Sequence, residues 1–388
     1  MNNALRKYYL LFLLTALLFS CHQRQNERHL VPHITKGKSL PVKYAKGFTV
    51  DYYDGFKVLS VRDVIDTSKL LARYILLNKG VQAPLDFKDA MQITQPVRKV
   101  VCISTTHIAE MLKLGLADSI AGITNTSFIY DSLVTEKVKN NEIANLGNDD
   151  VNFEKLVELN PSFVTTSGGY DGGDKLKLKL DALNVKSVID LDYKEQDPLG
   201  RAEWLKFIAA FYDKEQLADS IFSGIETNYL SLREKVKSVT TKPAVFCNLP
   251  YKEIWYMPSG ENYMARLFAD AGGDFLWHDA NSTNGLNLSL NYEAVYNRAA
   301  NADYWLNTGF ANSLEEIKDA DNKNAFFKAF KTGQVYNNNK RNTPGGGFDF
   351  WESGVVNPDK ILADLIFIFH PELLPGHEMY YYQKLKPK

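Results

Sequence analysis

The segment NFEKLVELNPSFVTTSG, residues 152–168, decides the fold of this 388-residue chain, because a second segment repeats its order. The second segment is NYEAVYNRAANADYWLNTG, residues 291–309. Each begins with Asn, continues with the spacing of a helix, and then has a short apolar strand and a Thr/Ser-Gly turn. A repeat of this kind predicts two halves with the same topology.

The correspondence extends upstream of both segments. RKVVCIS, residues 98–104, and KPAVFCNL, residues 242–249, have the pattern of buried strands, and a helical pattern follows each of them. Alternating strands and helices favour α/β lobes with parallel sheets. We therefore predict an N-terminal lobe over residues 98–197 and a C-terminal lobe over residues 240–388.

A helical connector is predicted between the lobes, over residues 198–239. Its second run begins at Asp213 and carries apolar residues at helical spacing, namely Leu217, Ile221, Ile225, Leu232 and Val236. A helix of about 24 residues is roughly 36 Å long, which is enough to bridge two lobes. A stiff bridge limits hinge motion and leaves a cleft whose width changes little.

Two further regions flank this arrangement. Residues 41–97 contain β-prone pieces separated by turn residues, which predicts a β-rich extension packed on the first lobe. A helix is predicted to begin at Asn357-Pro358 and to end before Pro371, and we expect it to cover the second lobe.

The N-terminus has the layout of an export signal. Arg6 and Lys7 precede an apolar run that ends at Ser20-Cys21, and this run is shorter than the ~20 residues that a membrane span requires. We predict a signal peptide over residues 1–20, lipidation of Cys21, which lies in a sequence that resembles the bacterial lipobox, and a flexible tether over residues 21–40. A plain secreted protein and a retained helix are the alternatives.

Composition narrows the function. Lys and Arg number 45 against 46 Asp and Glu, which argues against nucleic acid as a partner. The three Cys residues form no CxxC motif, and GxSxG, HExxH and phosphate-loop motifs are absent. We expect no enzyme, although a lipoprotein hydrolase that uses carboxylates such as Asp171, Asp174 and Asp349 is an alternative.

The ordered motifs resemble a known family. KVVCISTTHIAEMLKLGLADSIAGIT (99–124), NLGNDDVNFEKLVELNPSFVTTSG (145–168), ENYMARLFADAGGDFLW (261–277) and the repeat at 291–309 are similar to periplasmic substrate-binding proteins of iron-siderophore or cobalamin ABC importers. The similarity covers roughly residues 96–371. It implies a class III periplasmic-binding-protein fold, in which a long α-helix joins two Rossmann-like lobes.

The resemblance also implies a function. The protein would be a monomeric, non-enzymatic receptor without a cofactor, which captures a metal chelate (an iron-siderophore, cobalamin or haem) and delivers it to an ABC permease dimer. It would be lipid-anchored in the periplasm of a Gram-negative bacterium, at the inner or outer membrane. An outer-membrane-associated lipoprotein that works without a permease is the alternative.

Two glutamates match the family's permease-docking positions. Glu154 and Glu293 are placed equivalently in the repeat, and two such carboxylates can pair with arginines of a twofold-symmetric permease. The alternative is that each merely complements the dipole of its own helix from the first turn.

Ligands of open α/β sheets lie beyond the carboxyl ends of the strands. On this basis we predict the ligand-binding residues Ser104, Thr105, Thr106, His107, Tyr130, Asn148, Ser167, Tyr170, Asn287, Thr308, Phe310 and Trp351. Asn148, Ser167 and Asn287 occupy positions where the family's cobalamin receptors carry Trp, which favours a hydrophilic siderophore. His107 is either polar lining or a direct metal ligand, and because no second His stands at HxxxH or HxH spacing from it we expect no metal site. Gly345-Gly346-Gly347 would let the backbone approach the cleft or a neighbouring strand.

Overall fold

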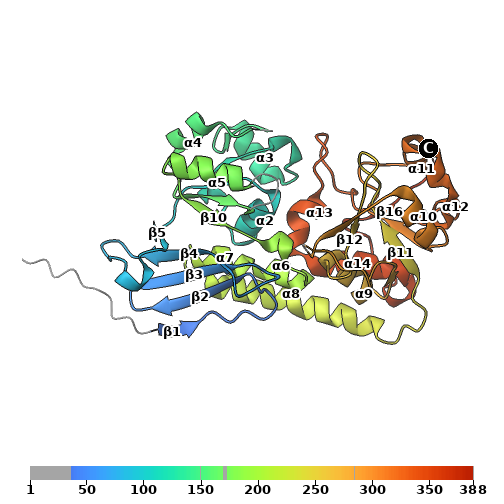
Figure 1. Ribbon diagram of the computed structural model, residues 1–388, viewed down its shortest axis with the longest axis horizontal. Helices are drawn as coiled ribbons and strands as arrows, with labels where there is room; N and C mark the ends of the chain where they lie inside the picture. Colours follow the sequence, from blue (N-terminus) through green and yellow to red (C-terminus); the bar gives the residue numbers. More distant parts are fainter. Residues whose placement is uncertain (1–35, 149, 169–172, 284, 388) are drawn as a thin grey trace, which may run out of the picture.

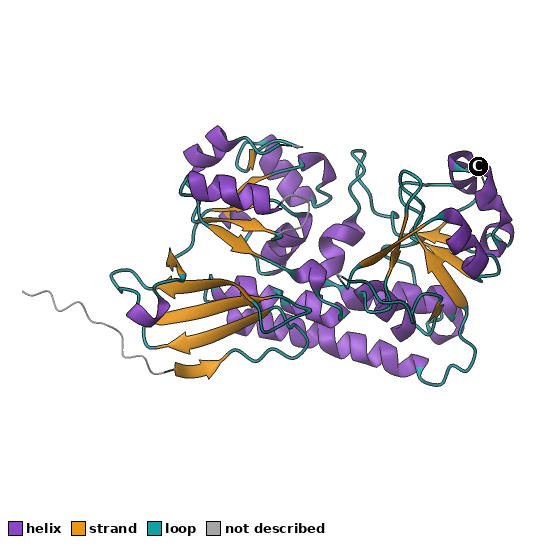
Figure 2. Cartoon of the chain, viewed as in Figure 1, coloured by secondary structure: helices purple, strands orange, loops and turns teal. Residues whose placement is uncertain are grey.

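The structure is a computed structural model that describes residues 36–387 except 149, 169–172 and 284. The expected signal peptide, Cys21 and Tyr170 lie outside the described residues. Figure 1 shows two lobes side by side, with the long helix α8 running beneath them and a separate sheet below the first lobe. Helices cover the lobe sheets (Figure 2), so the chain has the predicted α/β architecture.

Each lobe contains one five-stranded sheet. The N-lobe sheet has the order β10-β9-β6-β7-β8 and is parallel throughout. The C-lobe sheet has the order β13-β11-β15-β16-β17, and only β17 is antiparallel. The strands are β6 Val100–Cys102, β7 Ile120–Ile123, β8 Ala144–Asn145, β9 Phe163–Thr166, β10 Ser187–Ile189, β11 Ala244–Cys247, β13 Asp274–Phe275, β15 Tyr304–Leu306, β16 Val335–Asn337 and β17 Gln383–Lys384.

The internal repeat is confirmed by this topology. Strands β10, β9, β6 and β7 have the same neighbours in the N-lobe as β16, β15, β11 and β13 have in the C-lobe. Helices α4 (Phe153–Leu159) and α10 (Tyr292–Ala299) begin at Asn152 and Asn291, and each Asn side chain accepts a hydrogen bond from the backbone N–H three residues later. Cys102 and Cys247 end the equivalent strands β6 and β11 as buried free thiols.

The remaining elements cover the sheets or connect them. They are α2 Thr105–Lys113, α3 Ser132–Lys139, α5 Gly173–Ala182, α9 Tyr263–Asp270, α11 Leu314–Ala320, α12 Lys328–Lys331, α13 Asp349–Glu352, α14 Pro358–Phe369, and the antiparallel pair β12 Trp255–Pro258 with β14 Asn287–Leu290. Helix α14 begins at the predicted Pro358 and lies in the C-lobe core. Within the described part of the chain, no helix combines the length and apolarity needed to cross a membrane.

The connector consists of α6 (Pro198–Glu203), α7 (Leu205–Ala210) and the 22-residue α8 (Glu215–Val236). The N-terminal part of α8 places Ala218 in the core of the first lobe, whereas Phe222, Ile225 and Tyr229 belong to the core of the second. One continuous helix therefore holds both lobes, as the apolar spacing predicted.

The N-terminal extension forms a separate sheet beside the first lobe (Figure 1). Its sheet has the order β1-β2-β3-β4-β5, with β1 Lys36–Ser39, β2 Phe48–Tyr53, β3 Phe56–Arg62, β4 Leu70–Leu77 and β5 Met91–Thr94. The prediction of a tether through residue 40 is wrong at its end, because β1 pairs with β2 from Lys36 onward. All four residues of β1 are exposed, so backbone pairing and not apolar burial orders this edge strand.

The extension shares a core with the first lobe through α7. Trp204, which precedes α7, is fully buried against Phe48 and Phe207 with ring centroids 4.9 and 5.1 Å apart. Glu203 is fully buried and accepts hydrogen bonds from the backbone N–H groups of residues 43, 44 and 45. A buried carboxylate with several donors anchors the chain that carries it, so the extension is fastened to the connector.

Candidate ligand-binding cleft

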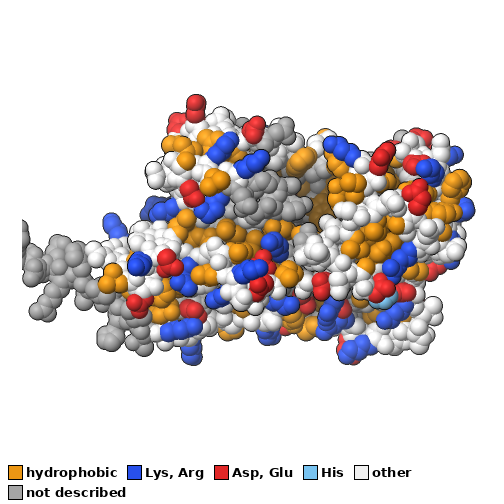
Figure 3. Space-filling model, viewed as in Figure 1, with side chains coloured by type: hydrophobic (Ala, Val, Ile, Leu, Met, Phe, Trp, Pro, Cys, Tyr) orange, Lys and Arg blue, Asp and Glu red, His pale blue; other side chains and the backbone are white. Residues whose placement is uncertain are grey.

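A cavity of about 410 Å³ lies between the two lobes. The space-filling view in Figure 3 is hollowed between them. The residues that line this cavity are Ser104, Thr105, Thr106, Tyr193, Arg201, Asn248, Pro258, Asn262, Tyr263, Met264, Leu286, Asn287, Asn307 and Trp351. Hydroxyls come mainly from the N-lobe and amides from the C-lobe, so a ligand here would contact both.

The first turn of α2 forms the N-lobe side of the cleft. Ser104 caps the helix, and its Oγ accepts a hydrogen bond from the N–H of Thr106 at 3.3 Å. Helix N-termini carry a partial positive charge, because their first N–H groups have no partner within the helix. Thr105 and Thr106 therefore present hydroxyls beside a site that favours negative charge.

Helix α9 brings the equivalent end to the cleft from the C-lobe. Asn262 caps it, accepting from the N–H of Met264 at 2.8 Å while its Nδ2 donates to the carbonyl of Leu286. Tyr263 and Asn287 lie next to this cap, at the start of α9 and on the β12–β14 pair. Two capped helix N-termini, one per lobe, thus border the same cavity.

Arg201 brings a positively charged guanidinium to the cleft, which the carboxylate of Asp192 partly balances. Its guanidinium donates to Asp192 Oδ2 at 2.7 Å and lies over the ring of Tyr263, 4.2 Å from the centroid. Both contacts hold the side chain in one position, and only 8% of the residue is exposed. The helix ends and Arg201 together suit a ligand whose periphery is anionic.

A buried polar group lies directly beneath this side of the cleft. His107, Glu110, Asp190 and Asp192 are at most 2% exposed, and Thr106 of the cleft donates to Asp192 Oδ1 at 3.4 Å. Burial, together with the charge of Asp192, raises the pKa of Asp190 to about 8. Burial and the charges of both aspartates raise the pKa of Glu110 well above its usual value. Burial lowers the pKa of His107 to about 4.

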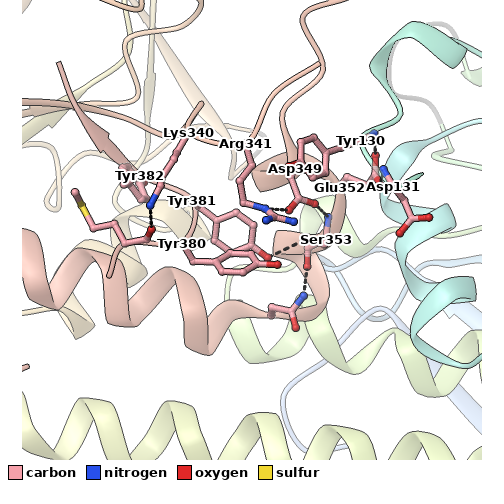
Figure 4. Close-up of polar contacts among 12 residues, drawn as sticks. Tyr130, Asp131, Lys340, Arg341, Asp349, Glu352, Ser353, Tyr380, Tyr381 and Tyr382 are labelled. Carbon is pink, nitrogen blue, oxygen red and sulfur yellow. Dashed lines mark hydrogen bonds and ion pairs between the residues drawn. The ribbon is translucent and has the colours of Figure 1, made fainter. Parts of the chain in front are cut away.

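The lobes also meet directly at a second place, next to the cleft. Glu352 of α13 accepts hydrogen bonds from the backbone N–H of Tyr130 at 2.7 Å and of Asp131 at 2.9 Å. Figure 4 shows its carboxylate directed toward these two residues of the N-lobe, with the ion pair of Arg341 and Asp349 to its left. Burial raises the pKa of Glu352 to about 7, although the two amide hydrogen bonds act in the opposite direction.

The glycines at 345–347 make a third contact between the lobes. The Thr343 hydroxyl donates to the carbonyl of Ser127 at 2.7 Å. A Cβ on Gly345 would lie 2.5 Å from that oxygen, and a Cβ on Gly347 would lie 2.0 Å from the carbonyl oxygen of Phe128. The predicted close approach of the backbone is therefore made to the opposite lobe, and it requires glycine at both positions.

The predicted ligand residues fall into two groups. The structure brings Ser104, Thr105, Thr106, Asn287 and Trp351 together in the cleft. The others lie elsewhere: His107 and Thr308 are fully buried, Tyr130 lies at the Glu352 contact, Asn148 and Phe310 are exposed, and Ser167 follows β9 without lining the cavity. His107 points inward because α2 already begins at Thr105, which places its third residue on the sheet-facing side.

The residues that sequence analysis missed come from the segment after β10. Tyr193 follows the carboxyl end of this strand, so the strand-end rule, applied to β10, would have found it. Arg201 belongs to α6, where no local pattern marks it as a cleft residue.

The two proposed docking glutamates are both exposed. Glu154 and Glu293 lie in the first turns of α4 and α10, the helices that the repeat makes equivalent. Their positions suit an external partner and also suit the helix dipole, since both are acidic residues near a helix N-terminus.

Comparison with known proteins identifies the family. Residues 100–341 match the family model described as periplasmic binding protein. A Methanocaldococcus jannaschii protein described as an uncharacterized lipoprotein is 30% identical over 368 residues, covering 88% of this chain and 85% of its own. A second Methanocaldococcus jannaschii protein with the same description is 27% identical and covers 81% of this chain and 80% of its own.

Solved structures share the fold. A Staphylococcus epidermidis solute-binding protein, described as a possible iron-binding protein, has a TM-score of 0.55 at 16% identity and covers 71% of this chain and 99% of its own. Staphylococcus aureus IsdE, solved with heme, has a TM-score of 0.52 at 18% identity, covering 70% and 99%. The matching family model, the repeated lobes, the long helix and the cleft between the lobes agree: this chain belongs to the periplasmic binding protein family.

Proposed function

We propose that this protein is the receptor of an ABC importer and captures an anionic metal chelate, with an iron-siderophore as the first candidate. The observation that carries the proposal is the cleft, where two helix N-termini and Arg201 face one cavity that side chains of both lobes line. Amides and hydroxyls bind the polar periphery of such a ligand, while Tyr193, Tyr263 and Trp351 cover its flat or apolar parts.

Two points favour this class of ligand. The names of the structural neighbours mention iron and heme, which are both metal-centred cargoes. The lining itself combines positive charge with many neutral donors, which fits a siderophore bearing carboxylate, catecholate or hydroxamate oxygens. Haem stays a second candidate because Tyr263 and Met264 could each offer an axial ligand atom.

Tryptophan fluorescence tests the ligand class. Titration of the protein with ferric siderophores, haem and cobalamins is expected to change the emission of Trp351, which is 43% exposed and lines the cleft, whereas Trp204, Trp255 and Trp305 are fully buried. The change in emission should be smaller in Trp351→Phe, in which only the buried tryptophans remain, while stoichiometric binding, measured by calorimetry, persists. If no compound of the panel binds, the metal-chelate assignment is refuted.

The same titration distinguishes a receptor from a hydrolase. A receptor releases its ligand unaltered, which mass spectrometry of the recovered ligand would establish. Asp349, one of the carboxylates considered for hydrolysis, is buried and occupied by Arg341 and the N–H of Ser353. Turnover of any bound compound would contradict the receptor proposal.

Docking to the permease is proposed for Glu154 and Glu293. The double variant Glu154→Arg/Glu293→Arg should abolish uptake and leave the affinity of the isolated protein for its ligand unchanged, because neither residue lines the cleft. Glu136→Arg, a charge reversal at another exposed N-lobe glutamate, is the matched control and should transport normally. Normal uptake by the double variant would exclude these two residues as the docking pair.

Export and anchoring through Cys21 complete the proposal. The relatives described as lipoproteins support a lipid anchor, and because they come from an archaeon, they do not restrict this protein to a Gram-negative bacterium. Cys21→Ser should move the protein from the membrane fraction to the soluble fraction after cell lysis. Retention of this variant in the membrane fraction would contradict lipidation at that residue.

A further inference from the structure

A group of four ionisable side chains lies under the N-lobe side of the cleft. His107 and Glu110 come from α2, and Asp190 and Asp192 follow β10. One ligand atom each of His107, Asp190 and Asp192 can be chosen so that all three lie within 4.8 Å of one another. None of these four residues lines the cavity between the lobes, so the group is distinct from that cavity.

The orientation of His107 leaves one ring nitrogen free. Nδ1 lies 2.8 Å from the Thr165 hydroxyl, which in turn donates to the carbonyl of Val101. The hydroxyl therefore accepts from Nδ1–H, which leaves the lone pair on Nε2. Among the described residues Nε2 has no hydrogen-bond partner, although the side chain is fully buried. A histidine held through Nδ1–H with Nε2 free has the arrangement found at metal centres.

The carboxylates supply unsatisfied oxygens on the same side. Asp190 Oδ1 accepts from the N–H of Asp192, whereas its buried Oδ2 has no N–H or hydroxyl donor in the described part of the chain. Both buried oxygens of Glu110, one helical turn after His107, also lack such a donor there, and the carboxyls of Glu110 and Asp190 face each other. Buried carboxylate oxygens without donors are unfavourable unless a proton or a cation compensates them.

We infer that His107, Asp190 and Asp192, with Glu110 beside them, form a binding site for a divalent transition-metal cation such as Zn²⁺, Mn²⁺ or Fe²⁺. One imidazole and several carboxylates suit these ions better than they suit Cu⁺, which prefers sulfur. Ligand atoms ~2.1 Å from a tetrahedral ion stand about 3.4 Å apart, so side-chain movements of about 1 Å or slightly more close the site.

The spacing of histidines along the chain did not indicate this metal site. No second histidine lies at HxxxH or HxH spacing from His107, so the sequence led us to expect no metal site there. The ligands here are brought together by the packing of α2 on the end of β10 instead. Thr106 and Arg201 contact Asp192 and also line the cleft, so an ion would enter through the cleft. The inference concerns a free cation and does not depend on which chelate the cleft holds.

Metal binding to the full mature chain tests the inference. The protein is stripped with a chelator, desalted, and titrated with Zn²⁺, Mn²⁺ and Fe²⁺ alone by calorimetry, with metal content measured by mass spectrometry. We expect about one tightly held ion per chain for at least one metal, and a higher melting temperature with the ion bound. Asp190→Asn and His107→Gln should each weaken binding at least tenfold.

Two controls make the outcome decisive. Asp190→Asn keeps the side-chain shape and takes one ionisable acid out of a crowded acidic group, so its apo form should melt no lower than the apo wild type. His278→Gln removes an exposed histidine that pairs with Asp274 and should bind metal like the wild type. The tether histidines His22, His29 and His33 are present in every variant. The inference is overturned if the wild type retains no metal and shows no melting shift, or if folded Asp190→Asn binds as tightly.

Discussion

Closure of the lobes should be linked to the protonation of Glu352. Burial, helped by the nearby charges of Asp349 and Asp131, raises the pKa of this carboxyl from 4.5 to about 7 where it contacts the N-lobe. Glu352 lies where the lobes touch, so even the small separation that α8 permits lets the carboxyl meet water, and its pKa then returns toward the ordinary value of a glutamate, about 4.3–4.5. Between these two values the closed form holds a proton that the open form has lost, so falling pH favours closure.

The magnitude follows from the two pKa values. At pH 8 both forms are ionised and the proton contributes almost nothing to closure. At pH 6 the closed form is about nine-tenths protonated, which favours it by about 1.4 kcal/mol, or roughly tenfold in the ratio of closed to open molecules. Glu352 also lines a second cavity, separate from the ligand cleft. The other charged groups around this second cavity are Lys113, Asp131, Arg341, Asp349 and Lys360, and they are present in every variant compared.

Glu352→Gln is the variant that isolates this effect. A glutamine side chain cannot ionise, so its closed fraction should not change between pH 8 and pH 6. The closed fraction can be measured by electron–electron distances between spin labels at Lys139→Cys and Lys318→Cys, which replace exposed residues on the two lobes. A Cys21→Ser background leaves only Cys102 and Cys247, and both are buried.

The control is Glu378→Gln, which removes an exposed glutamate of the C-lobe and should keep the pH dependence of the wild type. A closed fraction that rises with pH in the wild type would contradict the assignment of proton uptake to closure. So would an equal pH dependence in Glu352→Gln, because another group would then carry the proton.

Four further outcomes are expected. Gly347→Ala should hold the lobes apart and weaken ligand binding, because its Cβ would lie 2.0 Å from the Phe128 carbonyl oxygen. Gly224 lies inside α8, and a Cβ added there would have no atom within 4 Å. Gly224→Ala should therefore raise the free energy of unfolding by up to about 1 kcal/mol. Unchanged affinity in Gly347→Ala would refute the contact. Trp204→Ala should lower the free energy of unfolding by about 3–5 kcal/mol in urea denaturation, and a loss below ~1 kcal/mol would show that the extension does not depend on it. Tyr74→Phe should cost about 1–3 kcal/mol in the same assay, because its hydroxyl accepts a buried backbone N–H; no loss would mean that water replaces the hydroxyl.

The amino-acid pattern was sufficient for most of the architecture. The repeat predicted two lobes of equal topology, the Asn residues before α4 and α10 predicted where those helices begin, and the spacing from Asp213 predicted α8. These features depend on neighbours three or four residues away, so they can be read along the chain. The edge strand β1 could not be predicted, because its exposed residues are ordered only by pairing with β2.

The residues of the cleft can be divided in the same way, into those that local sequence predicts and those that only packing brings there. Ser104, Thr105 and Thr106 could be predicted because strand β6 ends just before them and α2 begins at Thr105. Arg201 could not, since only the docking of α6 against both lobes brings it into the cleft.

Local sequence thus established the lobes, the bridging helix and one wall of the cleft, since hydrophobic spacing and helix capping act over a few residues. The packing of distant segments decided the rest: His107 faces Asp190 under the cleft, and Gly347 lies against Phe128 across it. Such contacts depend on how whole elements pack on one another, and no short stretch of the chain encodes that arrangement.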